Sequence, residues 1–598
     1  MGEPHGRRQR IWSLLSSPRV ALLAAGVAVV LNLSSVGTGW HVDDLYHRAQ
    51  FLEIGPLSDS SNMTNRMFDF LSGDPEQILT FKELGVLPWW ANDHLKISFW
   101  RPLSSFTHVI DYALWPQSAP LMHLHSVAWL GLLVFLTALW YRQAMAFSSV
   151  AGLSAILYAL DDAHGLPAGF LANRNAIVAT TLGVLSLWMH DRARRDDFRP
   201  GLVLSPLAFG CALLSGESGI GAAAYLFAYA VCLEPGPVVR RLSTIAPHGF
   251  VGLGWLVLYR MMGFGTSGSE FYVDPVGQPL AWLGAFLVRA PVLLLGQWFV
   301  PPSSFVLLWT PAQTVGVAVF GVSVMAILFV LLRPILREEP TARFFALGMI
   351  LAVVPITAGY PNDRLLFFVG LGAMGLLALL LVRLFDRKRT ATVGRLVGWA
   401  LVVVHVVIAA PLQVLMSASM ASQEPLYAAA PRSLPDDTQL ASQRLVVVNQ
   451  PSFFYGQYLL LVRTMDSRPA PESLLLMAPG TSALTVERVS TSEVLIEAED
   501  GYLNGPFDNV YRSSHGFPED YRLELSDVRI EVMSLTEDGR PRRVHFTFAV
   551  PLEDPSLRWV RFEDGRYVPF AVPPVGDSVT IEAVVLNLLS PPAYEEGP

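Results

Sequence analysis

Long apolar runs alternate with short polar loops over the first 420 residues of the chain. Most of these runs approach the roughly 20 residues that cross a bilayer as a helix. They lie near 20–33, 122–141, 146–160, 168–189, 201–215, 218–233, 244–262, 312–332, 343–359, 365–384 and 395–415. We therefore predict a polytopic α-helical membrane domain over residues 1–420, with 11 spans and with 12 or 13 as alternatives.

Basic residues fall in alternate loops, and this pattern predicts the orientation of the chain. The short loops between these basic loops are nearly free of bases, with Arg174, Arg289 and Arg364 as the exceptions. The positive-inside rule then places the N-terminus in the cytoplasm, with the first run as an uncleaved signal anchor. The stretch 264–311 must begin and end outside. Its apolar part, 280–300, is thus expected to be a re-entrant or interfacial segment, or a pair of partial spans.

Two long polar stretches interrupt or follow the spans. Residues 39–120 form a large first outer loop whose tryptophans favour a position along the membrane face. Residues 442–598 alternate with period 2 between turn residues, which predicts a mostly β extracytoplasmic domain. Strands are expected near 444–449, 493–498, 521–532, 544–550, 559–562 and 578–585, with a helical stretch at 453–465. Residues 421–441 are predicted to be a flexible linker.

Composition agrees with a membrane protein and excludes several other classes. The chain is 52% hydrophobic and only 15% charged, against about 25% charged residues in soluble proteins. It has no basic domain for nucleic acid. Its two cysteines, Cys211 and Cys232, lie in apolar runs and form no disulfide framework.

A metal site is not predicted from histidine spacing. His123 and His125 are two residues apart, so they lie on different faces of one helix. The spacing of His41, His47, His94 and His164 requires no metal either. We expect no cofactor, although a divalent cation on adjacent carboxylates stays open.

Adjacent carboxylates, Asp43 and Asp44, stand where the first span meets the outer loop. Because two neighbouring carboxylates repel each other, one can have a raised pKa and act as a base. The alternatives are that the pair binds a divalent cation or caps a helix of the loop.

Three arginines and one glutamate at the outer membrane edge are further candidates. Arg101 precedes Pro102 at the start of a predicted helix, where free N–H groups suit a phosphate. Arg174 and Arg364 are lone outer arginines that could bind a lipid-linked phosphate, or instead reach to lipid headgroups. Glu217 lies at the edge of a span, where a carboxylate is either functional or a polar contact between helices.

Several short motifs occur in a fixed order along residues 20–385. They are the acid pair, Trp100-Arg101-Pro102-Leu103, Asp111-Tyr112-Ala113-Leu114-Trp115, His123-Leu124-His125, Asn173-Arg174-Asn175, Gly216-Glu217 and Asn362-Asp363-Arg364-Leu365-Leu366. Together they resemble the GT-C membrane glycosyltransferases, and within them a bacterial branch similar to the protein O-mannosyltransferases and transmembrane O-mannosyltransferases. The chain departs from that branch in lacking a lysine before Glu217 and in carrying Asn173 where the branch has glycine. The tandem repeat domains and the β-trefoil of that family are not recognisable in the part of this chain that follows the spans.

The resemblance implies an inverting transfer of one sugar from a polyprenyl-phosphate donor to a protein or glycan acceptor on the outer face of the cell membrane. It implies that Asp43 or Asp44 is the general base, and we expect Asp43 to fill this role with Asp44 as its partner. Arg101, Arg174, Arg364, Glu217 and His123 are the candidates for binding the substrate and its phosphate.

Two other functions remain open from the sequence. A transporter or flippase for lipid-linked saccharides would share the spans and the outer arginines. A non-catalytic subunit of a cell-envelope assembly would use the β domain as its working part. An enzyme should bring an aspartate of the pair within about 10–12 Å of Arg364 or Arg174, beside a cavity open to lipid and water.

Overall fold

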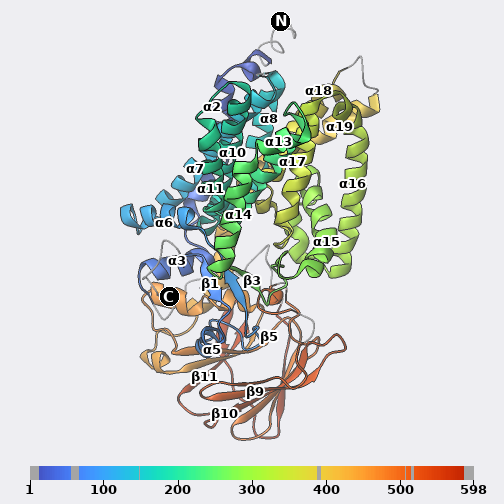
Figure 1. The fold of residues 1–598 in the computed structure, drawn as a ribbon. Coiled ribbons are helices and arrows are strands. Elements are labelled where there is room, and N and C mark those ends of the chain that lie inside the picture. Colours follow the sequence, from blue (N-terminus) through green and yellow to red (C-terminus); the bar gives the residue numbers. More distant parts are fainter. Residues whose placement is uncertain are drawn as a thin grey trace, which may run out of the picture.

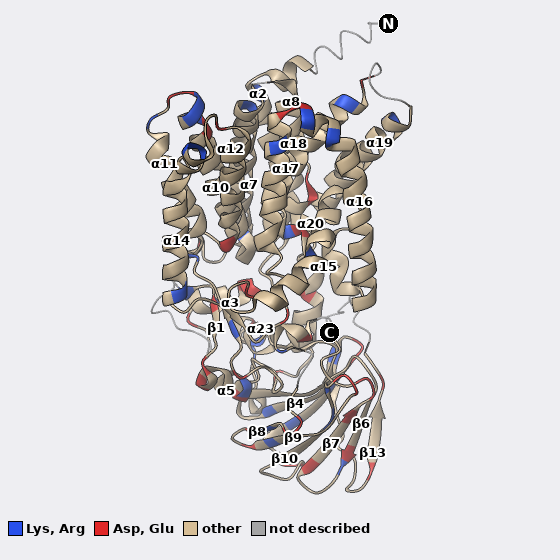
Figure 2. Cartoon of the chain, turned by 45° about the vertical axis from the view of Figure 1, so that its right-hand side comes forward, with Lys and Arg blue, Asp and Glu red and all other residues tan. Residues whose placement is uncertain are grey.

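The chain forms a bundle of helices with a β-sheet domain at one end (Figure 1). The structure is a computed structural model, and it describes residues 12–54, 66–146, 148–386, 392–505, 507–513 and 517–584. The described part of the chain begins at the end of the bundle away from the β domain (Figure 1). Lysines and arginines gather at that same distant end (Figure 2), which is the asymmetry on which the predicted orientation rests.

Each of the 11 apolar runs contains a helix. The helices are α2 (Arg19–Leu31), α7 (Ala119–Ala144), α8 (Ser149–Ala159), α10 (Arg174–Arg195), α11 (Gly201–Leu213), α12 (Gly221–Cys232), α14 (Ala246–Met261), α16 (Pro311–Glu338), α17 (Pro340–Ile356), α18 (Phe367–Leu384) and α19 to α20 (Thr392–Val402 and Ala409–Ala418, joined by a π-helical segment). Among the described residues, six segments are long and apolar enough to cross a membrane: Arg19–Gly37, Ala119–Ala144, Pro279–Trp298, Pro311–Glu338, Phe367–Leu384 and Thr392–Ala418. The number of spans stays a prediction.

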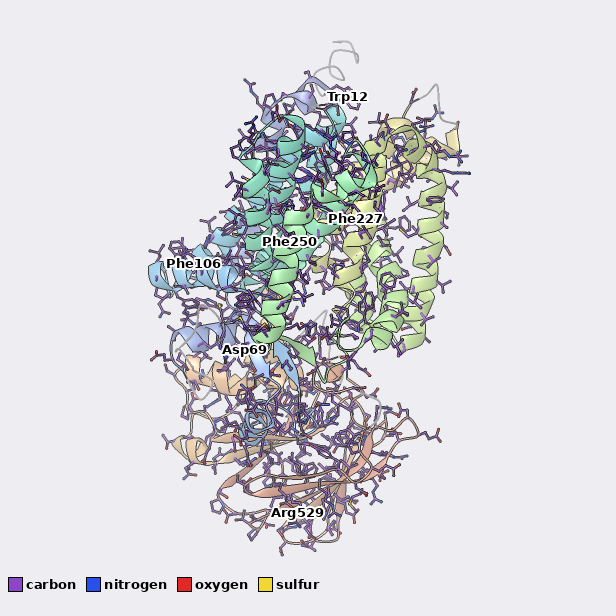
Figure 3. All side chains as sticks on the ribbon, viewed as in Figure 1. Trp12, Asp69, Phe106, Phe227, Phe250 and Arg529 are labelled. Atoms are coloured by element: carbon purple, nitrogen blue, oxygen red, sulfur yellow. The ribbon has the colours of Figure 1, made fainter. Side chains whose placement is uncertain are left out.

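The helices at the centre of the bundle are buried, and those at its periphery expose apolar side chains. In α18, 83% of the apolar window is buried inside the protein, against 22% in α16. The contact between α17 and α18 depends on Gly372, since a Cβ there would lie 2.5 Å from the backbone oxygen of Phe345. Small residues at helix crossings allow such close approach in membrane proteins. Phe227 and Phe250, labelled in Figure 3, belong to the exposed apolar periphery.

The segment near 280–300 is one continuous helix, α15 (Pro279–Trp298), which contains Pro291. The predicted pair of partial spans is therefore wrong. After α15 the chain makes the turn η6 (Ser303–Leu308) before α16 begins. The carboxylate of Asp363, which lies just before α18, accepts hydrogen bonds from the backbone and hydroxyls of Ser303 and Ser304 in that turn.

The first loop folds into short helices and a three-stranded sheet. Its elements are α3 (Asp43–Phe51), β1 (Asp69–Ser72), α5 (Pro75–Leu84), β2 (Lys96–Ser98) and α6 (Pro102–Leu114), and β3 (Gly265–Ser267) completes the sheet in the order β1-β2-β3. In α6 the buried side chains are polar, whereas Phe106 and Leu114 are 52% and 65% exposed (Figure 3). A helix with its apolar side outward is suited to lie against lipid.

Five of the six predicted strands of the C-terminal domain are present as single strands, the predicted strand at 521–532 is divided into two, and three further strands occur. One sheet is antiparallel, in the order β13-β6-β7-β10-β9-β8, and the other is β12-β11-β4-β5. The strands are β4 (Arg444–Gln450), β5 (Ser473–Pro479), β6 (Leu484–Arg488), β7 (Glu493–Ala498), β8 (Arg522–Glu524), β9 (Val528–Leu535), β10 (Pro541–Phe548), β11 (Leu557–Glu563), β12 (Arg566–Pro569) and β13 (Ser578–Ile581). Strands β4 and β5 are parallel, so their connection must cross over, and it does so through α22 (Phe453–Gly456) and α23 (Leu459–Met465).

The β domain is fastened to the first loop and does not hang from a linker. Residues 421–432 form packed helical turns in which Tyr427 is only 2% exposed, so a flexible linker over the whole of 421–441 is wrong. Gly85, with φ +74°, ends α5 against the backbone of Leu474 in β5. The Trp89 indole donates to the carbonyl of Met477, and first-loop and β-domain side chains share one apolar core. The first loop and the β domain therefore act as one structural unit.

Candidate functional site

A cavity of about 920 Å³ lies where the bundle, the first loop and the β domain meet. Its walls come from all three parts of the chain. The polar side chains in its lining that matter below are Asp43, Arg101, Glu217, Arg364, Tyr458 and Tyr511. Four of the seven residues predicted from the sequence to carry chemistry thus border one space, although they are up to 321 residues apart in sequence.

Asp43 is the first residue of α3, and its half-buried side chain faces the cavity. The Tyr458 hydroxyl donates a hydrogen bond of 3.4 Å to its Oδ1 atom. Burial raises the pKa of this carboxyl, while the charges of Arg364 and Arg101 and the Tyr458 hydrogen bond act in the opposite direction. A partly desolvated carboxylate with a raised pKa is a stronger proton acceptor than a solvated one.

Asp44 has a different environment from its neighbour. It is 2% exposed, and it accepts hydrogen bonds from the backbone N–H groups of His41 at 3.1 Å and Ala172 at 2.6 Å. Burial raises the pKa of Asp44 to about 7 despite these bonds. Because both oxygens are engaged with backbone, Asp44 ties the start of α3 to the bundle and does not line the cavity.

The turn before Asp43 is strained. Val42 has φ +50°, a left-handed conformation that a β-branched residue rarely adopts. Such a conformation persists only where the surroundings impose it. Here the hydrogen bonds that Asp44 accepts from His41, just before Val42, and from Ala172 of the bundle supply that constraint. The strained turn is what directs Asp43 into the cavity while Asp44 points into the protein.

Arg364 also lines the cavity. Within the described residues its guanidinium makes no hydrogen bond or ion pair with a protein group, and its Nε atom is buried without a partner. Its backbone is held by Asn362, whose side chain accepts from the Arg364 N–H. The neighbouring Asp363 anchors the turn at Ser303. A fixed arginine that lacks a protein partner is suited to bind an anion such as a phosphate.

Arg101 and Glu217 form an ion pair in the cavity wall. The Arg101 Nε atom lies 2.8 Å from Glu217 Oε2, and the Tyr259 hydroxyl donates to Glu217 Oε1 at 3.2 Å. The Arg101 guanidinium also lies over the rings of Phe99 and Phe68, at 4.3 and 5.1 Å. This arginine is already neutralised, so its charge is weaker toward a ligand than that of Arg364.

The structure does not bring Arg174 and His123 into the cavity. Arg174 is fully buried and pairs with Asp111 at 2.5 Å, and it donates to the Ser126 hydroxyl at 2.8 Å. His123 is also fully buried, where its Nε2 atom lies 2.7 Å from the carbonyl of Gly39. Both side chains therefore hold helices together. The predicted substrate contacts of Arg174 and His123 are not supported, because neither side chain lines the cavity.

The sequence did not identify the part of the site that the β domain supplies. The cavity is bordered from α22, the turn before α23 and the segment 507–511 by Phe454, Tyr458, Phe507 and Tyr511. The sequence indicated this region only as a predicted helical stretch at 453–465, to which no function was assigned. Among the described residues, no group of three or more His, Cys, Asp or Glu side chains is placed to hold a metal ion.

Comparison with known proteins gave matches only among solved structures. No protein-family model matches the sequence, and no curated protein matches it. The oligosaccharyltransferase of Archaeoglobus fulgidus in its apo form is 13% identical, with a TM-score of 0.38, over 76% of this chain and 64% of that one. The archaeal oligosaccharyltransferase AglB from the same organism, in complex with an inhibitory peptide and a dolichol-phosphate, is 12% identical with a TM-score of 0.37 over the same shares. The chain spans less than two thirds of the length of these proteins.

Proposed function

We propose that the protein is a membrane glycosyltransferase that moves a sugar from a polyprenyl-phosphate donor to a hydroxyl acceptor on the outer face of the cell membrane. The observation that supports this most is the pairing within one cavity of a desolvated carboxylate, Asp43, with an unpartnered guanidinium, Arg364. These are the two groups that transfer from a sugar phosphate requires. The charge of Arg364 acts on Asp43, so both belong to one electrostatic unit.

In the proposed reaction, Asp43 accepts the proton of the acceptor hydroxyl as its oxygen attacks the anomeric carbon. The new bond joins that carbon to the acceptor oxygen, and the bond to the phosphate oxygen breaks. The lipid phosphate leaves with the bonding pair, and the anomeric configuration inverts. Arg364 stabilises the charge that builds up on the departing phosphate. A charge-assisted hydrogen bond of this kind contributes about 1.5–3 kcal/mol.

The residues that line the cavity support a donor that is carried by a lipid. Its lining includes apolar side chains of the bundle, among them Leu256 of α14, Ala352 and Ile356 of α17, and Phe368 of α18. These helices belong to the membrane domain. The polar groups lie at the end of the bundle that faces the β domain, where α3 is placed (Figure 2). A polyprenyl chain would thus follow the bundle while its phosphate meets Arg364.

The test uses the full chain in lipid nanodiscs with radiolabelled short-chain polyprenyl-phosphate hexoses. Transfer to acceptors from the native cell envelope should fall by at least 100-fold in Asp43→Asn. In Arg364→Met the loss of one charge-assisted hydrogen bond should lower kcat/KM by roughly 10- to 150-fold. The exposed residues Asp520 and Arg566 provide matched controls, Asp520→Asn and Arg566→Met, which should keep full activity.

The effect of the same variants can also be measured on the glycans and glycoproteins of the cell that produces the protein. Asp43→Asn should remove one specific glycan or glycoprotein while the abundance of the protein stays unchanged. Full transfer by Asp43→Asn would refute the assignment of the base. Movement of labelled lipid-linked sugar across the bilayer without transfer would instead indicate a flippase.

A further inference from the structure

The β domain forms one wall of the cavity, and that wall contains aromatic surface that the domain leaves uncovered. Phe454, in α22, and Phe507, after β7, are both partly exposed within a domain whose other large apolar side chains are mostly buried. Their rings are stacked, with centroids 4.6 Å apart and planes inclined by 20°. Both line the cavity.

The pair of Phe454 and Phe507 is connected to the carboxylate of Asp43 through Tyr458. The ring of Phe454 lies 6.2 Å from the ring of Tyr458, and the Tyr458 hydroxyl donates to Asp43. Gln457 fixes the arrangement, because its Oε1 atom accepts from the Tyr46 hydroxyl of α3 and its Nε2 atom donates to the carbonyl of Phe454. A molecule on the aromatic pair would therefore be next to the proposed base.

Tyr511 adds a polar group without a partner. Its side chain is 3% exposed and lines the cavity, and its hydroxyl makes no hydrogen bond with the described residues. Burial raises the pKa of the Tyr511 hydroxyl, and the negative charge of Asp43 makes a smaller contribution in the same direction, so the two groups are within electrostatic reach of each other. A buried hydroxyl that lacks a partner is costly unless something binds to it.

We propose that Phe454, Phe507 and Tyr511 form the acceptor subsite, and that the acceptor is a saccharide. This proposal rests on the proposed function, because it takes Asp43 to be the base that receives the acceptor proton. The C–H groups of a sugar ring carry partial positive charge and pack on the negative face of an aromatic ring. Ring hydroxyls supply the hydrogen bond that Tyr511 lacks. Transfer then forms a bond from the donor sugar to a hydroxyl of the acceptor sugar.

A peptide acceptor is less well matched by this surface. An extended peptide is held mainly through its backbone N–H and C=O groups, as when a strand is added to a sheet. The groups described here are two phenyl rings and a phenol, which match a neutral ring bearing hydroxyls. The peptide alternative is an outcome of the test.

The test measures acceptor binding without donor, by saturation-transfer NMR on the full chain in nanodiscs. The probes are free maltose, cellobiose, mannobiose and chitobiose, and a neutral octapeptide that contains serine and threonine. At least one disaccharide should bind, and its Kd should rise at least tenfold in Phe454→Ala. Tyr511→Phe removes only the hydroxyl and should raise the same Kd severalfold while the Tm is unchanged. Met533→Ala, at a 59% exposed position on β9, is the control and should bind as the wild type does.

Three results would overturn the acceptor subsite: no disaccharide binds, only the peptide binds, or binding is unchanged in both variants. The transfer assay separates this failure from that of the proposed function. If the wild type transfers sugar and the variants keep the acceptor KM, only the subsite is wrong. If the wild type binds a disaccharide but never transfers sugar, the glycosyltransferase assignment is wrong. If both are right, Phe454→Ala raises the acceptor KM and leaves the donor KM unchanged.

Discussion

Replacement of Tyr458 by phenylalanine should change the pH dependence of transfer in a predictable direction. The Tyr458 hydroxyl donates to Asp43 Oδ1 at 3.4 Å and favours the ionised carboxylate, so it lowers the pKa of Asp43. Tyr458→Phe removes that donor and should raise the pKa of Asp43. At any pH below the new pKa, a smaller fraction of the protein then carries the ionised base.

The size of the effect follows from the geometry. A hydrogen bond to a charged group contributes about 1.5–3 kcal/mol when it is short. At 3.4 Å the bond is longer than the usual range for O–H···O, so we assign it about 1 kcal/mol. This corresponds to roughly 0.7 pKa unit and to an approximately fivefold lower rate on the acid limb.

The assay is the pH profile of kcat/KM in the nanodisc transfer reaction, whose acid limb reports the base of the free enzyme. In Tyr458→Phe the acid limb should move to higher pH while the rate on the plateau stays near that of the wild type. Tyr455 belongs to the adjacent short helix and does not line the cavity, so Tyr455→Phe is the matched control. An acid limb of Tyr458→Phe that coincides with the wild type would contradict the assignment of Asp43 as the base.

Three further substitutions test the structural roles assigned above. Arg174→Met leaves the fully buried Asp111 without its arginine and should cost about 3–5 kcal/mol of stability, seen as a lower Tm, whereas Arg364→Met should leave the Tm near that of the wild type. The pKa of Asp44 is raised to about 7, so the folded state holds its proton more tightly than the unfolded state. Its contribution to stability is therefore present below about pH 4 and is lost as the pH rises toward 7, and Asp44→Asn should flatten that part of the stability curve measured by urea unfolding. Gly372→Ala places a Cβ 2.5 Å from the Phe345 oxygen and should lower stability by about 1–3 kcal/mol in the same measurement, and an unchanged midpoint would mean that α17 and α18 can separate freely.

Periodicity predicted the helices of the bundle and most strands of the β domain, because burial in lipid or in a sheet is imposed locally on each segment. It did not predict β5, β6 and β12 or the small sheet of the first loop. The run at 493–498 became β7 with the same bounds, and every apolar run in the bundle contains a helix. The segment at 421–441 was misjudged. Its Pro, Asp and Ser content is typical of a linker, whereas its burial depends on contacts with the first loop and the β domain.

The chemistry of the site was only partly predictable, because it depends on pairing between distant residues. Arg174 and Arg364 look alike in sequence, as lone arginines at the outer ends of spans. They differ because Asp111, on α6, neutralises Arg174, and no described residue does so for Arg364. The sequence likewise could not indicate Tyr511, because a tyrosine in a β domain gives the same pattern whether it fills a core or borders a cavity.

The hydrogen bond between Tyr458 and Asp43 joins residues 415 positions apart, and this separation has a consequence for biosynthesis. A ribosome completes Asp43 early and reaches Tyr458 only after all the helices of the bundle have been made. The newly inserted bundle therefore lacks the wall of the cavity that the β domain supplies. If the proposed function is right, sugar transfer can begin only once the last quarter of the polypeptide has folded against the bundle, which delays catalysis until synthesis is nearly finished.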